Sequence, residues 1–182
     1  MYIIEKAQKI QGEIKLQGSK NSALPILLTS LLCKESVVLK NVPLGLNDIK
    51  VAFNILEELG VDIRKIDDSI VEISSKNREI NDCVPESGNN IRYSLLFLSI
   101  LLNIKNEIYI PTPGGCQIGE RKYDIHLASL REMGAEIEEK DNYFHAKITG
   151  KFKSRHLKFH TATTTGTENV IIAAYFSSYH TS

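Results

Sequence analysis

Residues 53–73 read FNILEELGVDIRKIDDSIVEI, and residues 127–148, LASLREMGAEIEEKDNYFHAKI, repeat the same pattern. Gly60 and Gly134 correspond at an offset of 74 residues. In each copy, apolar residues fall on one helical face before the glycine, and short strands joined by a polar turn follow it. Each copy therefore predicts an amphipathic helix that ends at the glycine, and a β-hairpin after it. Two residues are expected to cap these helices: Asn47 and Asp124.

The segments upstream of the two copies also match each other. Residues 27–43 (LLTSLLCKESVVLKNVP) resemble residues 97–113 (FLSILLNIKNEIYIPTP), and each predicts the end of a helix, a strand and a loop with proline. The helices expected at residues 22–33 and 91–102 are apolar nearly all round, which indicates that they are buried.

These repeats predict the fold class and its organisation. We expect an α/β (α+β) chain that forms one incomplete domain over residues 1–182, with full repeats at about 12–75 and 80–150. A third copy begins at about 151–182, where residues 163–176 (TTTGTENVIIAAYF) predict a polar turn that leads into an apolar helix. An incomplete third unit leaves a sheet edge or a helix face uncovered. Either the chain is a fragment, or a second chain or a homo-oligomer completes the fold.

Composition excludes several classes of function. The chain has 22 basic and 22 acidic residues, so we expect neither nucleic acid nor a membrane surface as a partner. The longest apolar run is shorter than a membrane span, and the N-terminus lacks the apolar centre of a signal peptide. Three cysteines and five histidines show no disulfide or metal-ligand spacing. We therefore expect a cytoplasmic protein without a metal or a cofactor.

The sequence GSKNS at residues 18–22 leads into the first apolar helix. Its Lys20 and Asn21 offer an ammonium and an amide beside the free backbone N–H groups of a helix start, which favours an anion site. An ordinary capped helix start explains the same residues. The glycine spacing of a Walker-type phosphate loop is missing.

The sequence PTPGGCQIGER at residues 111–121 predicts a long loop around Cys116. The charge of Arg121 is expected to lower the pKa of this thiol, which favours a role as an acid, a nucleophile or a redox group. An incidental loop thiol explains the same residue.

Three other segments carry polar groups that an anion could contact. Arg92 begins an apolar helix, where a cation opposes the helix dipole, so either a ligand or a structural carboxylate should compensate it. The sequence TTTGTE at residues 163–168 offers hydroxyl and N–H groups to phosphate or sugar oxygens, or forms a capping turn. The alternating residues 151–158 predict an amphipathic strand with a solvated basic face.

Taken together, GSKNSALPILL, IRYSLLFL, PGGCQIGERKYDIH, LREMGAEI and TTTGTEN resemble the first half of the enolpyruvyl transferases. The cysteine loop is similar to the members that act on a nucleotide sugar rather than to the shikimate-pathway members. The resemblance runs from about residue 5 to the last residue. It implies an inverse α/β barrel of βαβαββ repeats, and a second, similar domain that is absent here.

The resemblance also implies the roles of individual residues. It implies that Cys116 is the catalytic general acid, forms a covalent adduct with phosphoenolpyruvate and is the target of fosfomycin. The residues that match phosphoenolpyruvate contacts are Lys20, Asn21 and Arg121. The residues that match UDP-sugar contacts are Arg92, Arg121, Lys122, Tyr123, Asp124, Ile125, Ala162, Thr163, Thr164 and Thr165. Here the sequence departs from the family, because Lys122 and Tyr123 replace a Pro-Val pair and the segment from Ala162 lacks the usual lysine.

The implied reaction transfers the enolpyruvyl group from phosphoenolpyruvate, a co-substrate, to UDP-N-acetylglucosamine in peptidoglycan precursor synthesis. The resemblance places the general base and further arginines in the second domain, so we expect the isolated chain to be inactive. Two alternatives stay open. One is a non-catalytic module that binds a nucleotide sugar or a partner, and the other is an enolpyruvyl transferase for a different nucleotide sugar.

Overall fold

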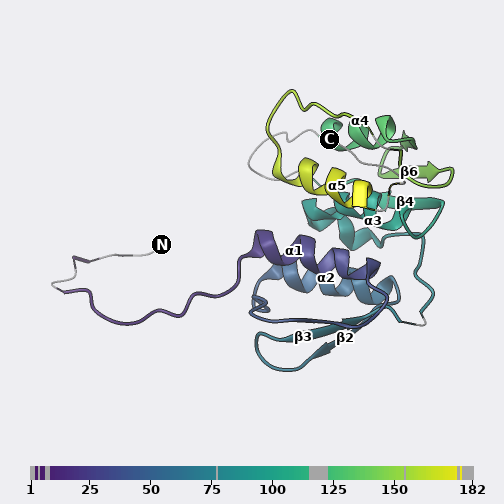
Figure 1. Ribbon diagram of the computed structural model, residues 1–182. Helices are drawn as coiled ribbons and strands as arrows, with labels where there is room; N and C mark the ends of the chain where they lie inside the picture. Colours follow the sequence, from purple (N-terminus) through teal and green to yellow (C-terminus); the bar gives the residue numbers. More distant parts are fainter. Residues whose placement is uncertain are drawn as a thin grey trace.

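The computed structural model describes residues 3, 5, 6, 9–76, 78–114, 123–153, 155–175 and 177. Two small sheets lie at the outside, and helices occupy the space between them (Figure 1). Within the described residues, no helix is both long and apolar enough to cross a membrane. The elements in chain order are α1 (Lys20–Thr29), η1 (Ser30–Leu32), β1 (Val37–Leu39), α2 (Asn47–Glu58), β2 (Asp62–Lys65), β3 (Val71–Ser74), η2 (Glu86–Asn90), η3 (Arg92–Leu96), α3 (Phe97–Leu102), β4 (Glu107–Pro111), α4 (Asp124–Glu132), β5 (Ala135–Glu139), β6 (Tyr143–Ile148) and α5 (Thr164–Tyr175).

The two sheets have the same topology. The first has the strand order β1-β3-β2 and the second β4-β6-β5, and all of their strand pairs are antiparallel. In the central strands, Ile73 pairs with Val37 and Ile63, and Ala146 pairs with Ile108 and Ile137. Helices and strands thus mix within one chain, and the predicted α/β fold class is confirmed.

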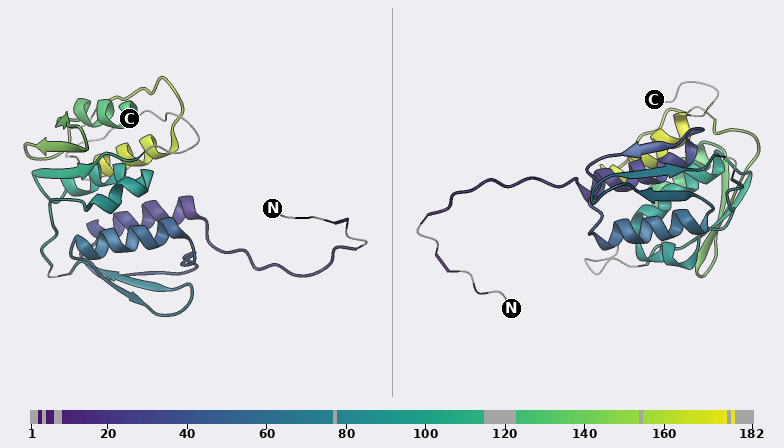
Figure 2. Two further views of the ribbon diagram at one scale, coloured as in Figure 1. Left: turned by 180° about the vertical axis from the view of Figure 1, so that it is seen from behind. Right: turned by 90° about the horizontal axis from the view of Figure 1, so that it is seen from below.

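The inner helices form the core. Leu24, Leu27 and Leu28 of α1 are fully buried, and every residue of α3 is buried. Helix α1 lies beside α2 over the first sheet, and η3 and α3 lie between α1 and the second sheet (Figure 2). Buried side chains from both repeats belong to one continuous hydrophobic core. The apolar helix predicted at residues 91–102 is therefore largely buried, whereas the one predicted at 22–33 is buried on one face only, because Ile26 of α1 is 51% exposed.

Some local predictions differ from the structure. Asn47 and Asp124 are the first residues of α2 and α4 rather than their caps, and neither helix has a side-chain cap. The predicted strand at residues 151–158 is wrong, because no described residue there is in a strand. The backbone of this segment instead passes beside the end of α4, and Lys153 N donates to the Met133 carbonyl at 2.7 Å. A strand needs a neighbouring edge, and alternation of residue types alone does not supply one.

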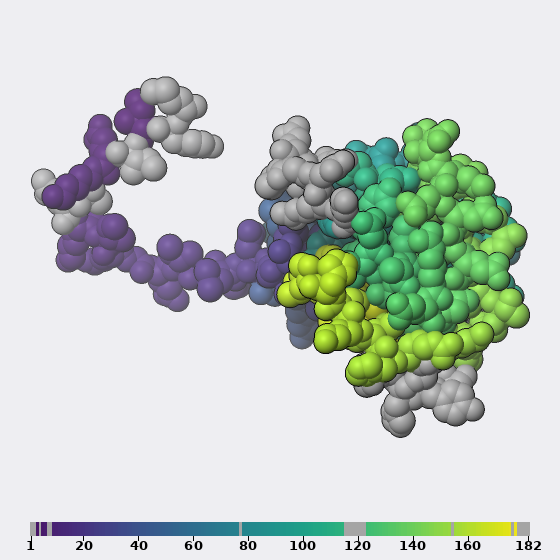
Figure 3. Space-filling model, turned by 90° about the horizontal axis from the view of Figure 1, so that it is seen from above, coloured from purple at the N-terminus to yellow at the C-terminus, as the bar shows by residue number. Residues whose placement is uncertain are grey.

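The N-terminal segment from residue 9 to residue 17 leaves the body of the molecule as an extended arm (Figures 1 and 3). Its apolar residues Ile10, Ile14 and Leu16 are at least 82% exposed. The arm therefore adds nothing to the core that positions the candidate site.

Candidate functional site

Lys20 and Asn21 lie in the first turn of α1, and both are exposed. Gly18 lets the chain before α1 pass close to the Asn41 carbonyl oxygen, because a Cβ atom there would overlap this oxygen. Lys20 Nζ is 2.8 Å from Asp48 Oδ2, in an ion pair whose two side chains stay partly exposed. Exposed pairs of this kind contribute little stability, so the ammonium remains available to an anion at the helix N-terminus.

Tyr93 connects the start of α1 to the second repeat. Pro25 has no N–H group, so the Asn21 carbonyl oxygen lacks the helical hydrogen bond that residue 25 would otherwise donate. The Tyr93 hydroxyl donates to this oxygen at 3.2 Å. The Asn21 carbonyl, which lacks a helical donor because of Pro25, therefore holds η3 next to the first turn of α1.

Glu168 extends this region to α5. Burial raises the pKa of Glu168. Burial also raises the pKa of Tyr93, and the charge of Glu168 raises it further, so the carboxylate and the phenol are close to each other. Glu168 Oε2 is buried and has no hydrogen-bond partner among the described residues. A donor group on a ligand would satisfy this oxygen, which favours binding here.

Arg92 and Thr165 approach each other across His126. Burial, and secondly the positive charge of half-buried Arg92, lower the pKa of His126 to about 4. His126 Nε2 is 3.3 Å from Thr165 Oγ1. Two segments predicted to contact the same ligand therefore lie beside one buried imidazole.

The other residues predicted before α5 differ in their surroundings. Thr163 Oγ1 accepts a hydrogen bond from Gly166 N at 3.1 Å, so this hydroxyl caps the helix. Ala162 and Thr164 are exposed. Thr163 thus fits the capping turn that the sequence left as an alternative, whereas Thr164 remains open to a ligand.

The start of α4 contributes Tyr123, Asp124 and Ile125. The Tyr123 ring packs edge-on against Phe144, with ring centroids 5.0 Å apart. Asp124 and Ile125 line a cavity of about 160 Å³ together with residues 157–160. Figure 3 shows this face, where the segment that leads into α5 lies beside α4. Three predicted residues fall outside the described residues: Cys116, Arg121 and Lys122.

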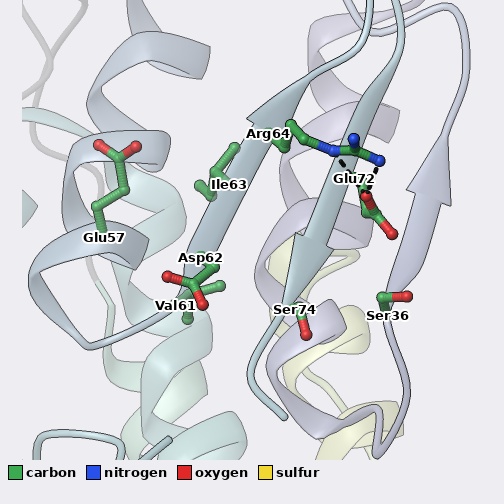
Figure 4. A pocket seen from close by; sticks show the side chains of 8 residues that line it. All are labelled: Ser36, Glu57, Val61, Asp62, Ile63, Arg64, Glu72 and Ser74. Atoms are coloured by element: carbon green, nitrogen blue, oxygen red, sulfur yellow. Dashed lines mark hydrogen bonds and ion pairs between the residues drawn. The ribbon is translucent and has the colours of Figure 1, made fainter.

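A second cavity, of about 590 Å³, lies on the first sheet (Figure 4). It contains none of the predicted site residues, and its Arg64 is paired with Glu72 at 2.6 Å. In the described part of the chain, no group of three or more His, Cys, Asp or Glu could hold a metal ion. The predicted residues that the structure describes lie instead on α1, on η3 and at or just before the starts of α4 and α5, and η3 contacts both α1 and α5.

Comparison with known proteins supplies the family. The family model for EPSP synthase (3-phosphoshikimate 1-carboxyvinyltransferase) matches residues 4–182. The chain belongs to the EPSP synthase family. It is 36% identical over 171 residues to the UDP-N-acetylglucosamine 1-carboxyvinyltransferase of Wolinella succinogenes, which covers 94% of this chain and 40% of the relative. The enzyme of the same name from Coxiella burnetii is 36% identical over 172 residues, which cover 94% of this chain and 39% of the relative.

Solved structures show the same fold. The enolpyruvyl transferase NikO of Streptomyces tendae superposes with a TM-score of 0.75 over 92% of this chain and 39% of its own, at 13% identity. EPSP synthase of Acinetobacter baumannii gives a TM-score of 0.69 over 91% of this chain and 38% of its own, at 15% identity. This EPSP synthase family chain thus spans about two fifths of the length of the curated relatives that it matches.

Three residues that lie beside the predicted contacts were not predicted from the sequence: Tyr93, His126 and Glu168. One signal could have found His126. The offset of 74 residues between the repeats places His126 opposite Ala52, a buried position of the first amphipathic helix. A histidine at a buried, repeated position requires a polar partner, so it signals a polar contact within the otherwise apolar core.

Proposed function

We propose that this chain is the part of an enolpyruvyl transferase that binds phosphoenolpyruvate and UDP-N-acetylglucosamine. The reaction is a cytoplasmic step of peptidoglycan precursor synthesis. The chain works together with a second domain, which corresponds to sequence that its longer relatives have and this chain does not match. Helix α5 is then the start of a third repeat of the same domain.

The convergence of predicted contacts from three separate segments carries this proposal. Lys20, Arg92 and Thr165 are far apart in the sequence, yet Tyr93 links the first two segments and His126 links the last two. The proposal thus draws on two cations and a half-buried hydroxyl from neighbouring segments. This set of groups suits a ligand that carries phosphate and sugar oxygens.

The proposed chemistry is addition followed by elimination. A sugar hydroxyl adds to C2 of phosphoenolpyruvate and loses its proton to a base of the second domain, while Cys116 protonates the methylene carbon. The resulting tetrahedral ketal then loses inorganic phosphate and a proton from the methyl group, which leaves the enolpyruvyl ether. Lys20 and Arg121 stabilise the phosphate as its bond breaks.

Two lysines in similar ion pairs provide a matched test of whether the charge of Lys20 contacts phosphate. Lys20 and Lys76 each form an exposed 2.8 Å ion pair, with Asp48 and Glu35 respectively. The chain is joined to the remaining part of the Wolinella succinogenes relative, and phosphate release from phosphoenolpyruvate is measured with UDP-N-acetylglucosamine present. We expect Lys20→Ala to lower kcat/KM by about 100-fold or more and Lys76→Ala to leave it unchanged. Equal activities of the two variants would contradict the proposed phosphate contact.

The role of Cys116 is tested in the same assay. Cys116→Ser should abolish most phosphate release without weakening the binding of UDP-N-acetylglucosamine, because the thiol acts on the other substrate. Full activity in this variant would exclude the acid role.

The absence of the family's lysine from the segment at Ala162 favours a second candidate, a transferase for another nucleotide sugar. Calorimetric titration of the 182-residue chain with several UDP-sugars separates the candidates. Tighter binding of a sugar other than N-acetylglucosamine supports the second one. Binding without turnover in the joined protein supports a non-catalytic module.

A further inference from the structure

Three buried polar side chains from three different helices meet behind Thr165. Ser99 of α3 and Asn169 of α5 are fully buried, and His126 of α4 is 2% exposed. Buried polar groups are costly unless they are hydrogen-bonded, so the bonding pattern at this point is strongly constrained.

The Leu95 carbonyl fixes the orientation of the Asn169 amide. This carbonyl can only accept, so the amide atom 3.0 Å from it is the Nδ2 donor. Asn169 Oδ1 on the other side accepts from the Ser99 hydroxyl. The same Nδ2 atom lies 3.1 Å from His126 Nδ1, and its second hydrogen points there. His126 Nδ1 must therefore be an acceptor without a proton.

A neutral imidazole with a bare Nδ1 carries its proton on Nε2. His126 is neutral near pH 7, because burial and the charge of Arg92 lower its pKa to about 4. Nε2 then donates to Thr165 Oγ1, 3.3 Å away. Within the part of the chain that the structure describes, the Thr165 hydroxyl donates no hydrogen bond of its own.

We infer that His126 is a positioning residue, which occupies the acceptor side of the Thr165 hydroxyl and directs its proton to an oxygen of the bound nucleotide sugar. The inference rests on the proposed function, because that function supplies the ligand. A chain of hydrogen bonds runs from the Leu95 carbonyl through Asn169 and His126 to Thr165. With one acceptor position of Oγ1 taken by the His126 Nε2–H group, the Thr165 proton is left to point outward, which favours an acceptor-rich ligand such as a phosphorylated sugar.

The imidazole itself gives a test that needs no ligand. Long-range ¹⁵N–¹H correlation spectra of the full chain at pH 7 distinguish the two neutral tautomers, and the signals missing from His126→Gln assign this histidine among the five. We expect the Nε2-protonated tautomer. The Nδ1-protonated form or a charged imidazole would overturn the inference.

Ligand binding tests whether the Thr165 hydroxyl donates to the nucleotide sugar. Thr165→Val removes the hydroxyl, and calorimetric titration with UDP-N-acetylglucosamine should show a 3- to 10-fold weaker affinity, about the value of one net hydrogen bond. The matched control is Thr167→Val, because the Thr167 hydroxyl donates within α5 to the Thr163 carbonyl at 2.6 Å. Its affinity should equal that of the wild-type chain. Equal losses in Thr165→Val and Thr167→Val would overturn the inference.

Two replacements of His126 separate positioning from packing. A glutamine can place its amide nitrogen near the Nε2 position and keep the donor to Thr165, whereas an asparagine is too short to reach it. We expect His126→Gln to retain affinity and His126→Asn to lose as much as Thr165→Val. The double variant His126→Asn/Thr165→Val should lose no more than either single variant, because both remove the same contact. Additive losses would contradict the inference.

The proposed function and this inference fail in different ways. No binding of any UDP-sugar by the wild-type chain would overturn the proposed function and the ligand contact together. Wild-type binding with an unchanged affinity in Thr165→Val would overturn only the inference. If His126→Asn does not fold, the tautomer and the comparison of Thr165→Val with Thr167→Val still decide the outcome.

Discussion

Helices α2 and α4 hold the same place in the two repeats, yet one buries an alanine where the other buries a histidine. Ala52 and His126 correspond at the offset of 74 residues, and both are buried. One turn later, Leu56 and Leu130 correspond in the same way and are fully buried. The apolar pattern of the repeat is thus preserved around a single polar exception.

The partner helices explain the exception. Helix α2 packs against α1, whose buried residues are leucines, whereas α4 packs against α5, which buries Asn169. An imidazole at position 52 would have no comparable partner, and its burial would be unfavourable. The difference teaches that this position of the repeat accepts an imidazole where the neighbouring helix supplies a hydrogen-bond partner, and an apolar side chain where it does not.

The largest expected effect tests whether the repeats share one core. Leu56→Ala and Leu130→Ala each remove a fully buried side chain, and each should lower the free energy of unfolding by about 2–5 kcal/mol. Urea unfolding followed by circular dichroism should show one transition in both variants, since both leucines belong to the same core. A second transition in either variant would show that the repeats unfold separately.

The next largest effect is a loss of stability at low pH. His126 causes it, whereas Ala52, which does not titrate, cannot. The folded pKa of His126, about 4, lies below the ordinary value of 6.5, so the unfolded chain binds more protons between these pH values. The contribution of neutral, buried His126 to the free energy of unfolding is complete above pH 6.5. It is lost as the pH falls toward 4, by up to about 3 kcal/mol. Urea unfolding at pH 7 and pH 4.5 measures the loss in the wild-type chain.

The control for this prediction is His126→Gln, which keeps every other titrating group. Its stability should fall less than that of the wild-type chain between the two pH values. Parallel changes in the two proteins would show that the pKa of His126 is the same in the folded and the unfolded chain.

The helices α2 and α4 and the glycines that follow them could be predicted from the sequence, because they depend on local signals. Helices α2 and α4 lie where the sequence predicts them and end just before Gly60 and Gly134, and both glycines have φ of +100°, which side chains disfavour. Periodicity and the glycine position are properties of neighbouring residues. They are visible without knowledge of what each helix contacts.

The site could be predicted only in part, because its contacts join distant residues. His126 meets Asn169 across 43 positions, and Asn169 meets the Leu95 carbonyl across 74. Tyr93 reaches the Asn21 carbonyl across 72 positions, at a vacancy that Pro25 creates. The sequence indicated which segments carry groups suited to an anion, which stays a prediction, but the pairing of their side chains depends on how the helices pack.

Gly60 and Gly134, which follow α2 and α4, have different neighbours. This predicts a smaller difference between the repeats in the stability lost on substitution. A Cβ atom at Gly60 would lie 2.8 Å from the Glu79 carbonyl oxygen, whereas at Gly134 its nearest neighbour is the flexible Lys153 side chain at 3.4 Å. Gly134→Ala should destabilise the chain by about 1–2 kcal/mol through its positive φ, and Gly60→Ala by more. Gly45→Ala is the control, since nothing lies within 4 Å of its Cβ position. Equal thermal midpoints for Gly60→Ala and Gly134→Ala would contradict this reasoning.

The smallest expected effect concerns the turns of the two hairpins. Asp67 Oδ1 accepts hydrogen bonds from Ser69 N at 2.6 Å and Ile70 N at 2.7 Å, whereas Asp141 accepts none from the described residues. Asp67→Ala should therefore lower the free energy of unfolding by at most about 1 kcal/mol, and Asp141→Ala by less than about 0.5 kcal/mol. Urea unfolding of both variants measures the difference. Because the β5–β6 turn is closed by Lys140 N donating to the Tyr143 carbonyl at 2.9 Å, a larger loss in Asp141→Ala would mean that its side chain, and not this backbone bond, holds the second hairpin.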